Sequence, residues 1–495
     1  VGYDGTFGRH VVSASAGILY NIYKTDFSQN GAAGKMVEYR HMTVNGAVNY
    51  AYDDRYVATF SFAADGSDNY RPGNRWGFYP SLGLGWIVSR ERFLRDSRMV
   101  DLLKLRASVG KNGWDPMGEM RYLWEGYYTG RGGLNTGNSE HTWHGGTALS
   151  YLPNPDVFAE KSLKYDAGID LRLWNRLSLN VDLFLEKRSG IVTQDWMIPG
   201  ASGVDNPPYR NIGRMTNKGF EVQLSWADRI GDFNYALTGM ASYNSNKVDY
   251  MAEVVTVPTA ARTGRRLDAL FGYVADGFYD WDDFDVGGEL REGLPKPTFG
   301  AVQPGDIKYK NLNGDTVIDE NDQTAIGDSY LPKLQYSFSL AASYKGFDLF
   351  ALFQGAAGRD VNLLDAPLQN VAFRDNGNVY GIAEGRWAYY PEQGIDTRAT
   401  ATYPRLSLQD NSNNYRNSTL WKRSGDFLKL RNVELGYTFA QPSLSKAGIS
   451  KIRIYLSGVN LLTVSRLMRD YDIDPEILSG HPALKSYNLG LTVTF

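Results

Sequence analysis

One stretch of the chain carries oxygen-bearing side chains at the spacing of a cation-binding loop. Residues 311–319 read NLNGDTVID, and Asp322 follows three positions later. Calcium loops place side-chain oxygens at the first, third, fifth, ninth and twelfth positions and a main-chain carbonyl at the seventh. The spacing therefore predicts a structural Ca²⁺ ion. Its expected ligands are the side chains of Asn311, Asn313, Asp315, Asp319 and Asp322 and the carbonyl oxygen of Val317.

Two departures from the pattern leave an alternative open. Asn311 stands at a position that is usually aspartate, and Thr316 stands where such loops have glycine. The first change removes a charge and the second removes conformational freedom. An ordered Asx turn without metal would use the same side chains. In either case we expect the loop to supply rigidity and no catalysis.

Aromatic side chains gather in the longest stretches between periodic segments. A flat ring beside Asn, Asp and Arg suits a sugar, which offers apolar C–H faces surrounded by hydroxyl groups. The same rings could equally pack against a partner protein or cap a loop. We expect most of them to be structural or to contact a partner. The rings chosen as substrate-binding candidates are Trp114, Trp124, Trp143, Trp281, Trp387 and Tyr389.

Other polar clusters predict no enzymatic chemistry. His141 and His144 have a spacing compatible with one metal ion, but no convincing third ligand accompanies them. The carboxylates within 280–285 resemble a solvated acidic loop. No nucleophile elbow, phosphate-binding loop or Ser-His-Asp grouping is present. The catalytic residues expected from the sequence are therefore none.

The last ten residues indicate the type of secondary structure that carries the side chains discussed above. Residues 486–495 read SYNLGLTVTF, with bulky apolar residues alternating strictly with small or polar ones. This period of two is typical of a β-strand. An outer-membrane strand needs an apolar face for lipid, a polar face for the lumen and an aromatic residue at the interface. Phe495 ends the chain as such an aromatic residue.

The same alternation recurs along the chain and predicts about fourteen strands. The clearest are 163–173 and 177–185. Asp166, Asp170 and Asp182 lie on faces that a dry sandwich core would not tolerate. They suit the wet interior of a transmembrane antiparallel up-and-down β-barrel, an all-β fold.

Connection lengths alternate, as in such barrels. Short turns are expected at Asp53-Asp54, Asn175-Arg176, 228–233 and Lys345-Gly346, and long outer loops near 111–160, 251–331, 358–424 and 466–485. Outer-membrane barrels combine short periplasmic turns with long outer loops. Five aromatic residues at the short-turn ends predict a periplasmic girdle in one plane: Trp174, Trp226, Tyr344, Phe439 and Phe495.

Composition agrees with this class. The 495 residues include no Cys, 53 Gly and 33 Tyr, and the formal net charge is −3. No basic face for nucleic acid is implied, and the absence of Cys excludes disulfide frameworks and thiolate metal sites. Val1 opens into VGYDGTFGRH without the basic and apolar regions of a signal peptide. We therefore expect the chain to be part of a longer or processed protein.

Several segments resemble the SusC/RagA family of TonB-linked outer-membrane transporters. They occur in family order along the chain, and together they are specific to that family. The segments are NYAYDDRYVATFSFAADGS (49–67), NRWGFYPSLGLGW (74–86), LKLRASVGKNG (103–113), DIKYKNLNGDTVIDENDQTAIG (within 305–327), SYKGFDLFALFQG (343–355), FLKLRNVELGY (427–437) and IYLSGVNL (454–461).

The resemblance implies a barrel of about 22 strands, of which residues 1–495 form the C-terminal part. It also implies a plug, a TonB-contacting segment and a signal peptide outside this sequence. The expected location is the cell outer membrane of a Gram-negative bacterium. The expected partners are a SusD-like surface lipoprotein and the TonB complex, and the family allows a dimer of transporter–lipoprotein pairs. We predict that strands near 11–23 and 487–493 do not pair with each other, and that another segment completes the barrel.

The function implied by the resemblance is TonB-dependent import of an oligomeric nutrient. An oligosaccharide is the first choice of cargo and a peptide the second. The alternatives are a passive porin or an adhesin-type barrel, and an outer-membrane enzyme would need convergent Ser, His or carboxylate groups at the rim. No cofactor is expected beyond the structural Ca²⁺.

Overall fold

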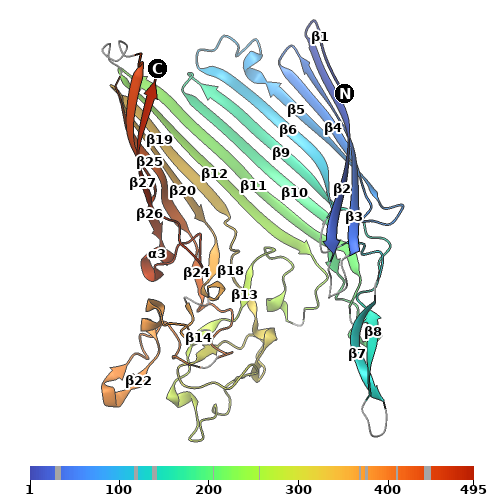
Figure 1. The fold of residues 1–495 in the computed structure, drawn as a ribbon, viewed down its shortest axis with the longest axis vertical. Helices are drawn as coiled ribbons and strands as arrows, with labels where there is room; N and C mark the ends of the chain where they lie inside the picture. The colour runs from blue at the N-terminus through green and yellow to red at the C-terminus, as the bar shows by residue number, and fades with distance from the viewer. Residues whose placement is uncertain are drawn as a thin grey trace. The chain divides into compact units, whose positions relative to one another are not determined.

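The computed structural model describes residues 1–495 except 28–34, 116–120, 127, 137–141, 205, 256, 367–369, 374–376, 409–410 and 440–447. Its main element is a sheet of fifteen strands in which spatial neighbours follow one another along the chain (Figure 1). The strands are β1 (Gly2–Phe7), β2 (His10–Phe27), β3 (Lys35–Tyr52), β4 (Tyr56–Ser67), β5 (Trp76–Ile87), β6 (Val100–Trp114), β9 (Glu160–Leu173), β10 (Leu177–Gln194), β11 (Tyr209–Ile230), β12 (Phe233–Tyr250), β19 (Leu334–Tyr344), β20 (Phe347–Ala357), β25 (Phe427–Phe439), β26 (Lys451–Ser465) and β27 (Ser486–Thr494).

Smaller elements occupy the connections. The short strands are β7 (Tyr128–Thr136), β8 (Thr142–Leu149), β13 (Leu270–Gly272), β14 (Ala275–Phe278), β15 (Lys296–Pro297), β16 (Ile307–Tyr309), β17 (Val317–Ile318), β18 (Thr324–Gly327), β21 (Asp360–Asn362), β22 (Tyr389–Tyr390), β23 (Ile395–Asp396) and β24 (Lys422–Ser424). The 3₁₀ helices are η1 (Val88–Arg90), η2 (Gly200–Ser202), η3 (Pro258–Ala260), η4 (Trp281–Asp283), η5 (Glu320–Asp322), η6 (Leu363–Asp365), η8 (Gly381–Gly385) and η9 (Pro391–Gln393), and the α-helix is α3 (Arg466–Tyr471). Within the described residues, none of the helices has the length and apolar character needed to span a membrane.

The meander of antiparallel strands confirms the predicted fold class. Strand β9 pairs with β6 so that Asp166 faces Ser108 and Asp170 faces Lys104, while Leu163 and Ile169 point to the other face and are exposed. Such alternation separates a charged inner face from an apolar outer face. The alternation in the sequence therefore located this strand and its orientation correctly.

Two details differ from the prediction. The sheet has fifteen strands, because Gly2–Phe7 forms a strand of its own that pairs with β2 through a turn at Gly8, whose φ is +63°. The turn after β9 is centred on Trp174 and Asn175, with φ of 53° and 50°, one residue earlier than expected. A two-residue hairpin turn of this type needs positive φ at both central residues. The sequence did not predict the turn at this position, because tryptophan rarely adopts positive φ.

Strands β1 and β27 each have a single neighbour in the sheet. In the described residues β2 pairs with β1 and β3, and β27 pairs with β26. The prediction that 11–23 and 487–493 form no ladder is confirmed. Completion of the barrel by another segment stays a prediction.

Two compact units make up the chain. Unit 1 contains Val1–Asn175, Leu179–Phe220 and Asn246–Val254, and unit 2 contains Arg176–Ser178, Glu221–Ser245 and Val255–Phe495. In unit 1 a small core of Tyr70, Leu123, Val157 and Val192 lies in the connections between strands. Unit 2 has a larger core, also built from connections: Tyr273, Ile307, Tyr309, Ile318, Val361, Leu363, Ala372, Ala383, Tyr403, Trp421 and Leu467.

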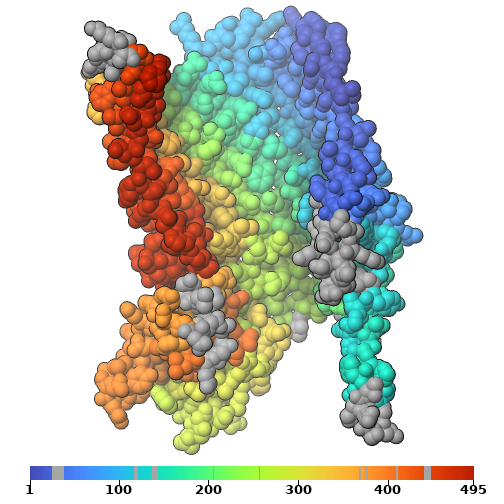
Figure 2. Space-filling model, in the orientation of Figure 1, coloured from blue at the N-terminus to red at the C-terminus, as the bar shows by residue number. Residues whose placement is uncertain are grey.

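The two longest connections of unit 2, the first joining β12 to β19 and the second joining β20 to β25, interlock through buried hydrogen bonds. They lie side by side in Figure 2. Asp306 of the first is fully buried and accepts hydrogen bonds from Arg405 Nε (2.7 Å) and Asn414 Nδ2 (2.9 Å) of the second. Tyr309 Oη donates to the carbonyl of Asn413 at 2.7 Å. Buried polar groups need such partners, because an unpaired one costs about 1–3 kcal/mol.

Aromatic residues collect at the short-turn ends, as the girdle prediction requires. In unit 2 the ring centroids of Phe347 and Tyr437 are 4.5 Å apart, and those of Tyr437 and Phe439 are also 4.5 Å apart. Tyr344, Phe439 and Phe495 are exposed, as is Trp174 in unit 1. Trp226 is half-buried and donates from Nε1 to Tyr235 Oη. That all five predicted residues share one plane stays a prediction.

Candidate substrate-binding site

The inner face of the sheet in unit 1 carries a cluster of paired charges. Arg106 of β6 donates to both oxygens of Asp182 on β10, and its guanidinium lies 3.5 Å from Asp166 Oδ1 on β9. Lys104 Nζ lies 3.7 Å from Asp170 Oδ2. These groups share one face because strand residues two apart point the same way. The cluster matches the wet interior predicted from the sequence.

A similar cluster lies on the sheet of unit 2. Arg453 of β26 donates to Asp348 of β20, with Nε at 3.1 Å from Oδ2, and to Glu434 Oε1 of β25 at 2.6 Å. A guanidinium can serve two carboxylates because it has five donors in a fixed plane. The inner face therefore remains strongly polar while its charges are neutralised locally.

A cavity of about 290 Å³ opens at the long-loop end of strands β2 to β6 in unit 1. Tyr23, Tyr39, Tyr79 and Trp114 supply rings, while His41, Asp65 and Arg75 supply polar groups. Its complete lining is Asn21, Tyr23, Tyr39, His41, Asp65, Ser67, Tyr70, Arg75, Tyr79, Gly113, Trp114, Asp115 and Ala159. Rings together with hydrogen-bonding groups can hold a polar ligand that also has apolar faces.

Asp115 fixes one wall of this cavity. Its carboxylate accepts hydrogen bonds from Tyr39 Oη (2.6 Å), Ser67 Oγ (2.5 Å), Asn69 Nδ2 (2.9 Å) and Tyr70 Oη (2.8 Å). Burial and the charge of Asp115 raise the pKa of Tyr70 well above its ordinary value. The Tyr70 hydroxyl therefore stays protonated and remains a donor. Four donors on one carboxylate make the wall rigid before any ligand arrives.

Trp114, His41 and Asp65 line the cavity and take no part in the Asp115 network. The Trp114 side chain is 52% exposed, and the Arg188 guanidinium carbon lies 5.7 Å from its ring centroid. Among the described residues, Asp65 Oδ1 is buried and has no hydrogen-bond partner. A buried acceptor without a donor is costly, so a ligand hydroxyl or amide that reached it would be bound favourably.

Only one of the predicted aromatic candidates, Trp114, lines this cavity. The sequence did not predict Tyr23, Tyr39, His41, Asp65 and Tyr79 as site residues. All five lie within strands, whereas substrate-binding residues were expected in loops. The available signal was the alternation, which places all five on the inner face of their strands.

The remaining predicted rings lie elsewhere. In unit 1, Trp143 on β8 is exposed, and Trp124 is half-buried with Nε1 donating to the Asn69 carbonyl at 3.1 Å. In unit 2, Trp281 on η4 is exposed, and the Arg398 guanidinium carbon lies 3.9 Å from the Tyr389 ring centroid. Arg398 also donates to Asp280, the residue before Trp281.

Trp387 does not fit the predicted substrate role. Its side chain is buried, and its ring lies so close to Gly305 that a Cβ there would approach Trp387 Cε3 to 2.5 Å. The ring therefore fills the interior of unit 2 and has no face to offer a ligand. Sequence alone could not separate it from the exposed Tyr390 three residues later.

The predicted calcium ligands make hydrogen bonds within their own loop. Asp315 Oδ1 accepts the Val317 N–H, Asp319 Oδ1 accepts the Asn321 N–H, and Asp322 accepts the N–H groups of Leu312 and Asp319. Asn311 and Asn313 accept the N–H groups of Gly314 and Asp315. In the parts of the chain that the structure describes, no three acidic or histidine side chains gather at one point. These hydrogen bonds form the Asx-turn network of the alternative, and the Ca²⁺ site stays a prediction.

The acidic stretch near 280–285 also has a structural role. Asp280 accepts the Trp281 N–H at 2.8 Å, and Asp283 accepts the Asp280 N–H at 3.0 Å, which caps η4. Of the histidine pair, His141 lies outside the described residues.

A buried lysine ties the last long loop to the sheet of unit 2. Lys429 of β25 has a side chain that is only 1% exposed, and its Nζ donates to Asp474 Oδ1 and Glu476 Oε2, each at 2.7 Å. Arg431 donates to the other Glu476 oxygen. Burial opposes charge on these acids, but hydrogen bonds from Lys429 to Asp474, and from Arg431 and Lys429 to Glu476, hold both pKa values below the ordinary range.

Comparison with known proteins places this arrangement in a family. The model of the family described as TonB dependent receptor-like, beta-barrel, matches residues 2–461. TonB-dependent receptor P26 of Formosa agariphila is 29% identical over 509 residues, which cover 96% of this chain and 48% of that protein. TonB-dependent receptor SusC of Bacteroides thetaiotaomicron is 26% identical over 486 residues, covering 91% of this chain and 43% of SusC.

A solved structure shares the fold. The structure of the RagAB peptide transporter superposes with a TM-score of 0.71 at 21% identity, covering 100% of this chain and 54% of that chain. The chain thus spans about half the length of the proteins it matches. The sequence-based expectation of a SusC/RagA-type barrel in the outer membrane is confirmed. The chain belongs to the TonB-dependent receptor-like β-barrel family.

Proposed function

We propose that the protein containing this chain imports an oligomeric nutrient across the outer membrane with energy delivered through TonB. The observation that carries the proposal is the cavity at the long-loop end of β2 to β6, lined by Trp114 and Asp65 beside the rigid wall around Asp115. A site of this kind holds cargo where it would enter. As in transport by a receptor of this family, the cargo would pass unchanged.

An oligosaccharide is the preferred cargo. Trp114 and the tyrosines of the cavity offer ring faces, and Asp65 and His41 offer hydrogen-bonding groups for hydroxyls. A peptide is the second candidate, and a specific observation supports it. The protein of similar fold is described as a peptide transporter, and a peptide would also present amide donors to Asp65.

The partners we propose are a SusD-like surface lipoprotein on the outer side and the TonB complex on the periplasmic side. Likeness to SusC and to RagAB supports both. The lipoprotein would close over the outer end of the barrel, and pairs of transporter and lipoprotein would assemble as dimers. Energy coupling would reside in parts of the protein outside residues 1–495.

Uptake by the full-length protein tests the proposal. Cells that carry the protein and its lipoprotein are given labelled oligosaccharides or labelled peptides, with TonB present or deleted. We expect accumulation of one cargo class that depends on both TonB and the lipoprotein. Uptake that continues without TonB and falls only with cargo size would establish the passive porin instead.

A further inference from the structure

The connection between β5 and β6, residues 88–99, is rich in exposed arginine and apolar residues. It lies at the short-turn end of the strands, because Ile87 N donates to the Arg55 carbonyl beside the Asp53-Asp54 turn. The exposed side chains are Arg90, Arg92, Phe93 (72%), Arg95, Asp96, Arg98 and Met99 (49%). Exposed apolar residues between arginines are typical of segments that lie at a membrane interface.

Two of the arginines of this connection are free to bind an anion. Arg90 pairs with Asp54 at 2.8 Å, and Arg95 pairs with Asp96 at 3.3 Å. For Arg92 and Arg98 the described residues provide no ion pair. Both side chains are exposed to the surroundings, so their charges remain available on either side of Phe93.

Glu91 places the connection on the outer, lipid-facing side of the sheet. Its Oε1 accepts from Tyr56 Oη at 2.6 Å and from Trp86 Nε1 at 3.2 Å. Tyr56 and Trp86 are paired across β4 and β5, and they share the outer face with Phe60 and Leu82. Arg92 follows Glu91 directly, so its Cα is only about 3.8 Å along the chain from that of Glu91.

An apolar groove begins at these same two rings. It encloses about 480 Å³ and runs between small residues, Ala58 and Ala107, and larger ones, Leu84 and Leu105. The full lining is Tyr50, Tyr56, Val57, Ala58, Leu84, Gly85, Trp86, Leu105, Arg106 and Ala107. Hydrocarbon covers the outer face of such a barrel, and a channel between bulky side chains suits a single acyl chain.

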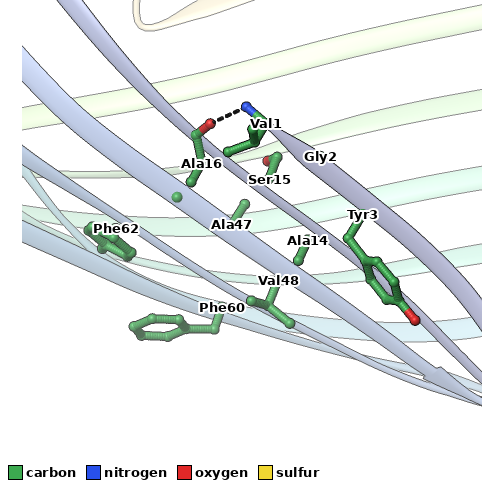
Figure 3. Close-up of a pocket in the computed structure, with 11 residues that line it drawn as sticks. Val1, Gly2, Tyr3, Ala14, Ser15, Ala16, Ala47, Val48, Phe60 and Phe62 are labelled. Carbon is green, nitrogen blue, oxygen red and sulfur yellow. Dashed lines mark hydrogen bonds between the residues drawn. The ribbon is translucent and has the colours of Figure 1, made fainter.

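A second groove provides a contrast. Figure 3 shows it beside β1, with Phe60, Phe62 and Val48 around the small residues Ala14 and Ala16. It has a comparable size of about 400 Å³, yet its lining contains no charged side chain. The first groove differs in that Tyr56 and Trp86 at its end hold Glu91, and the free Arg92 follows Glu91 in the chain.

We propose that the first groove and the 88–99 connection form a binding site for one anionic phospholipid of the periplasmic leaflet. An acyl chain lies in the groove between Ala58 and Ala107, and the Tyr56–Trp86 pair marks the boundary of the hydrocarbon. The phosphate contacts Arg92 and Arg98, and Phe93 enters the interface beside it. Arginine recognises phosphate through paired N–H donors, and each basic residue near an anionic membrane surface contributes roughly a fivefold increase in affinity.

Native mass spectrometry of the full-length protein tests the site. The protein is extracted in mild detergent and supplied with phosphatidylglycerol or phosphatidylethanolamine of identical acyl chains. We expect retention of phosphatidylglycerol in preference to phosphatidylethanolamine. The double variant Arg92→Ala/Arg98→Ala should lose roughly fivefold or more of that retention at low salt, and Ala107→Phe, which fills the groove, should lose it with both arginines intact.

Two matched variants serve as controls. Arg71→Ala removes an exposed arginine at the long-loop end of the same strands, and Ala14→Phe fills the second groove. Both should retain phosphatidylglycerol as the unchanged protein does, and the heat-dependent gel mobility of the barrel shows whether each variant has folded. Equal retention of the two lipids, or equal losses in all folded variants, would overturn the proposal. So would unchanged lipid retention accompanied by loss of a periplasmic protein partner, because the arginines would then bind that protein.

Discussion

Lys429 Nζ lies 2.7 Å from the Asp474 carboxylate, inside the protein and between segments separated by 45 residues of sequence. Both side chains are at most 3% exposed. Glu476 completes the contact on the same ammonium group. The pair holds the loop after β26 against strand β25. The buried ammonium group of Lys429 therefore helps to fix the position of this loop.

Replacing the lysine should release the loop. Lys429→Met keeps the length of the side chain but leaves the buried Asp474 carboxylate without its cation, which typically costs about 3–5 kcal/mol, while Glu476 keeps Arg431. We expect residues 466–485 to lose protection from amide hydrogen exchange, while β25 and β26 keep theirs.

Lys485→Met, which changes an exposed lysine of the same loop, is the control and should leave the protection as it was. Equal exchange in Lys429→Met and the unchanged protein would show that the loop is held by its apolar contacts, such as Leu467.

Acidification should release the same loop. The folded-state pKa values of Asp474 and Glu476 are depressed. Their contribution is therefore complete above the unfolded pKa of about 4 and is lost as the pH falls through the folded values. We expect protection of 466–485 to stay constant from about pH 7 to pH 5 and to fall below about pH 4. Loss of protection as the pH rises from 5 to 7 would contradict this assignment of charge.

Trp114 should contribute to cargo binding through its exposed ring. Trp114→Ala in the full-length transporter is expected to weaken cargo binding roughly tenfold, in the range usual for a buried aromatic contact. Trp196→Ala is a close control, because this ring is also 52% exposed but does not line the cavity. Titration calorimetry with the cargo found in the uptake assay measures both. A similar loss of cargo affinity in the two variants would show that the cavity is not part of the binding site.

Asp65 offers a second test of the cavity. Asp65→Asn keeps the shape of the side chain and removes its charge, so a cargo that donates to Oδ1 should bind less tightly, because hydrogen bonds to charged groups contribute about 1.5–3 kcal/mol. Thermal stability should change little or rise, because an unpaired buried charge is costly. Tighter cargo binding by this variant would mean that Asp65 repels the ligand.

The loop at 311–322 should be stable without metal. Its carboxylates already accept N–H groups, so we expect a chelator to leave the thermal midpoint of the full-length protein unchanged. Asp322→Ala should lower that midpoint, because Asp322 is fully buried and holds Leu312 and Asp319 through their N–H groups. A midpoint that rises with added Ca²⁺ and falls with the chelator would restore the calcium-loop hypothesis.

The sequence predicted the strands well because one face meets lipid and the other meets water. Strand β9 was expected at 163–173 and spans Glu160–Leu173. Strand β10 was expected at 177–185 but continues to Gln194, since its outer part, with Lys187 and Arg188, no longer alternates apolar and polar residues. Alternation reports only the lipid-facing portion, so strand ends beyond the membrane give no such signal.

The site was harder to predict, because it depends on contacts between distant segments. Nothing near Asp115 in the sequence indicates that Tyr39, Ser67 and Tyr70 donate to it. Trp387 and Trp114 look alike as loop-edge tryptophans, yet one lies in a core and the other in a cavity. Residue type and spacing therefore identify chemistry within a strand, but the assembly of several connections decides which rings remain accessible.

The interlocked connections of unit 2 restrict how its outer part can move. Separating them would expose Trp421 and Tyr403 and would leave Asp306 without its donors. Moving one connection without the other would therefore break these hydrogen bonds and open this core. A pull on either connection is consequently transmitted to the other, and strands β19, β20 and β25 receive the force together.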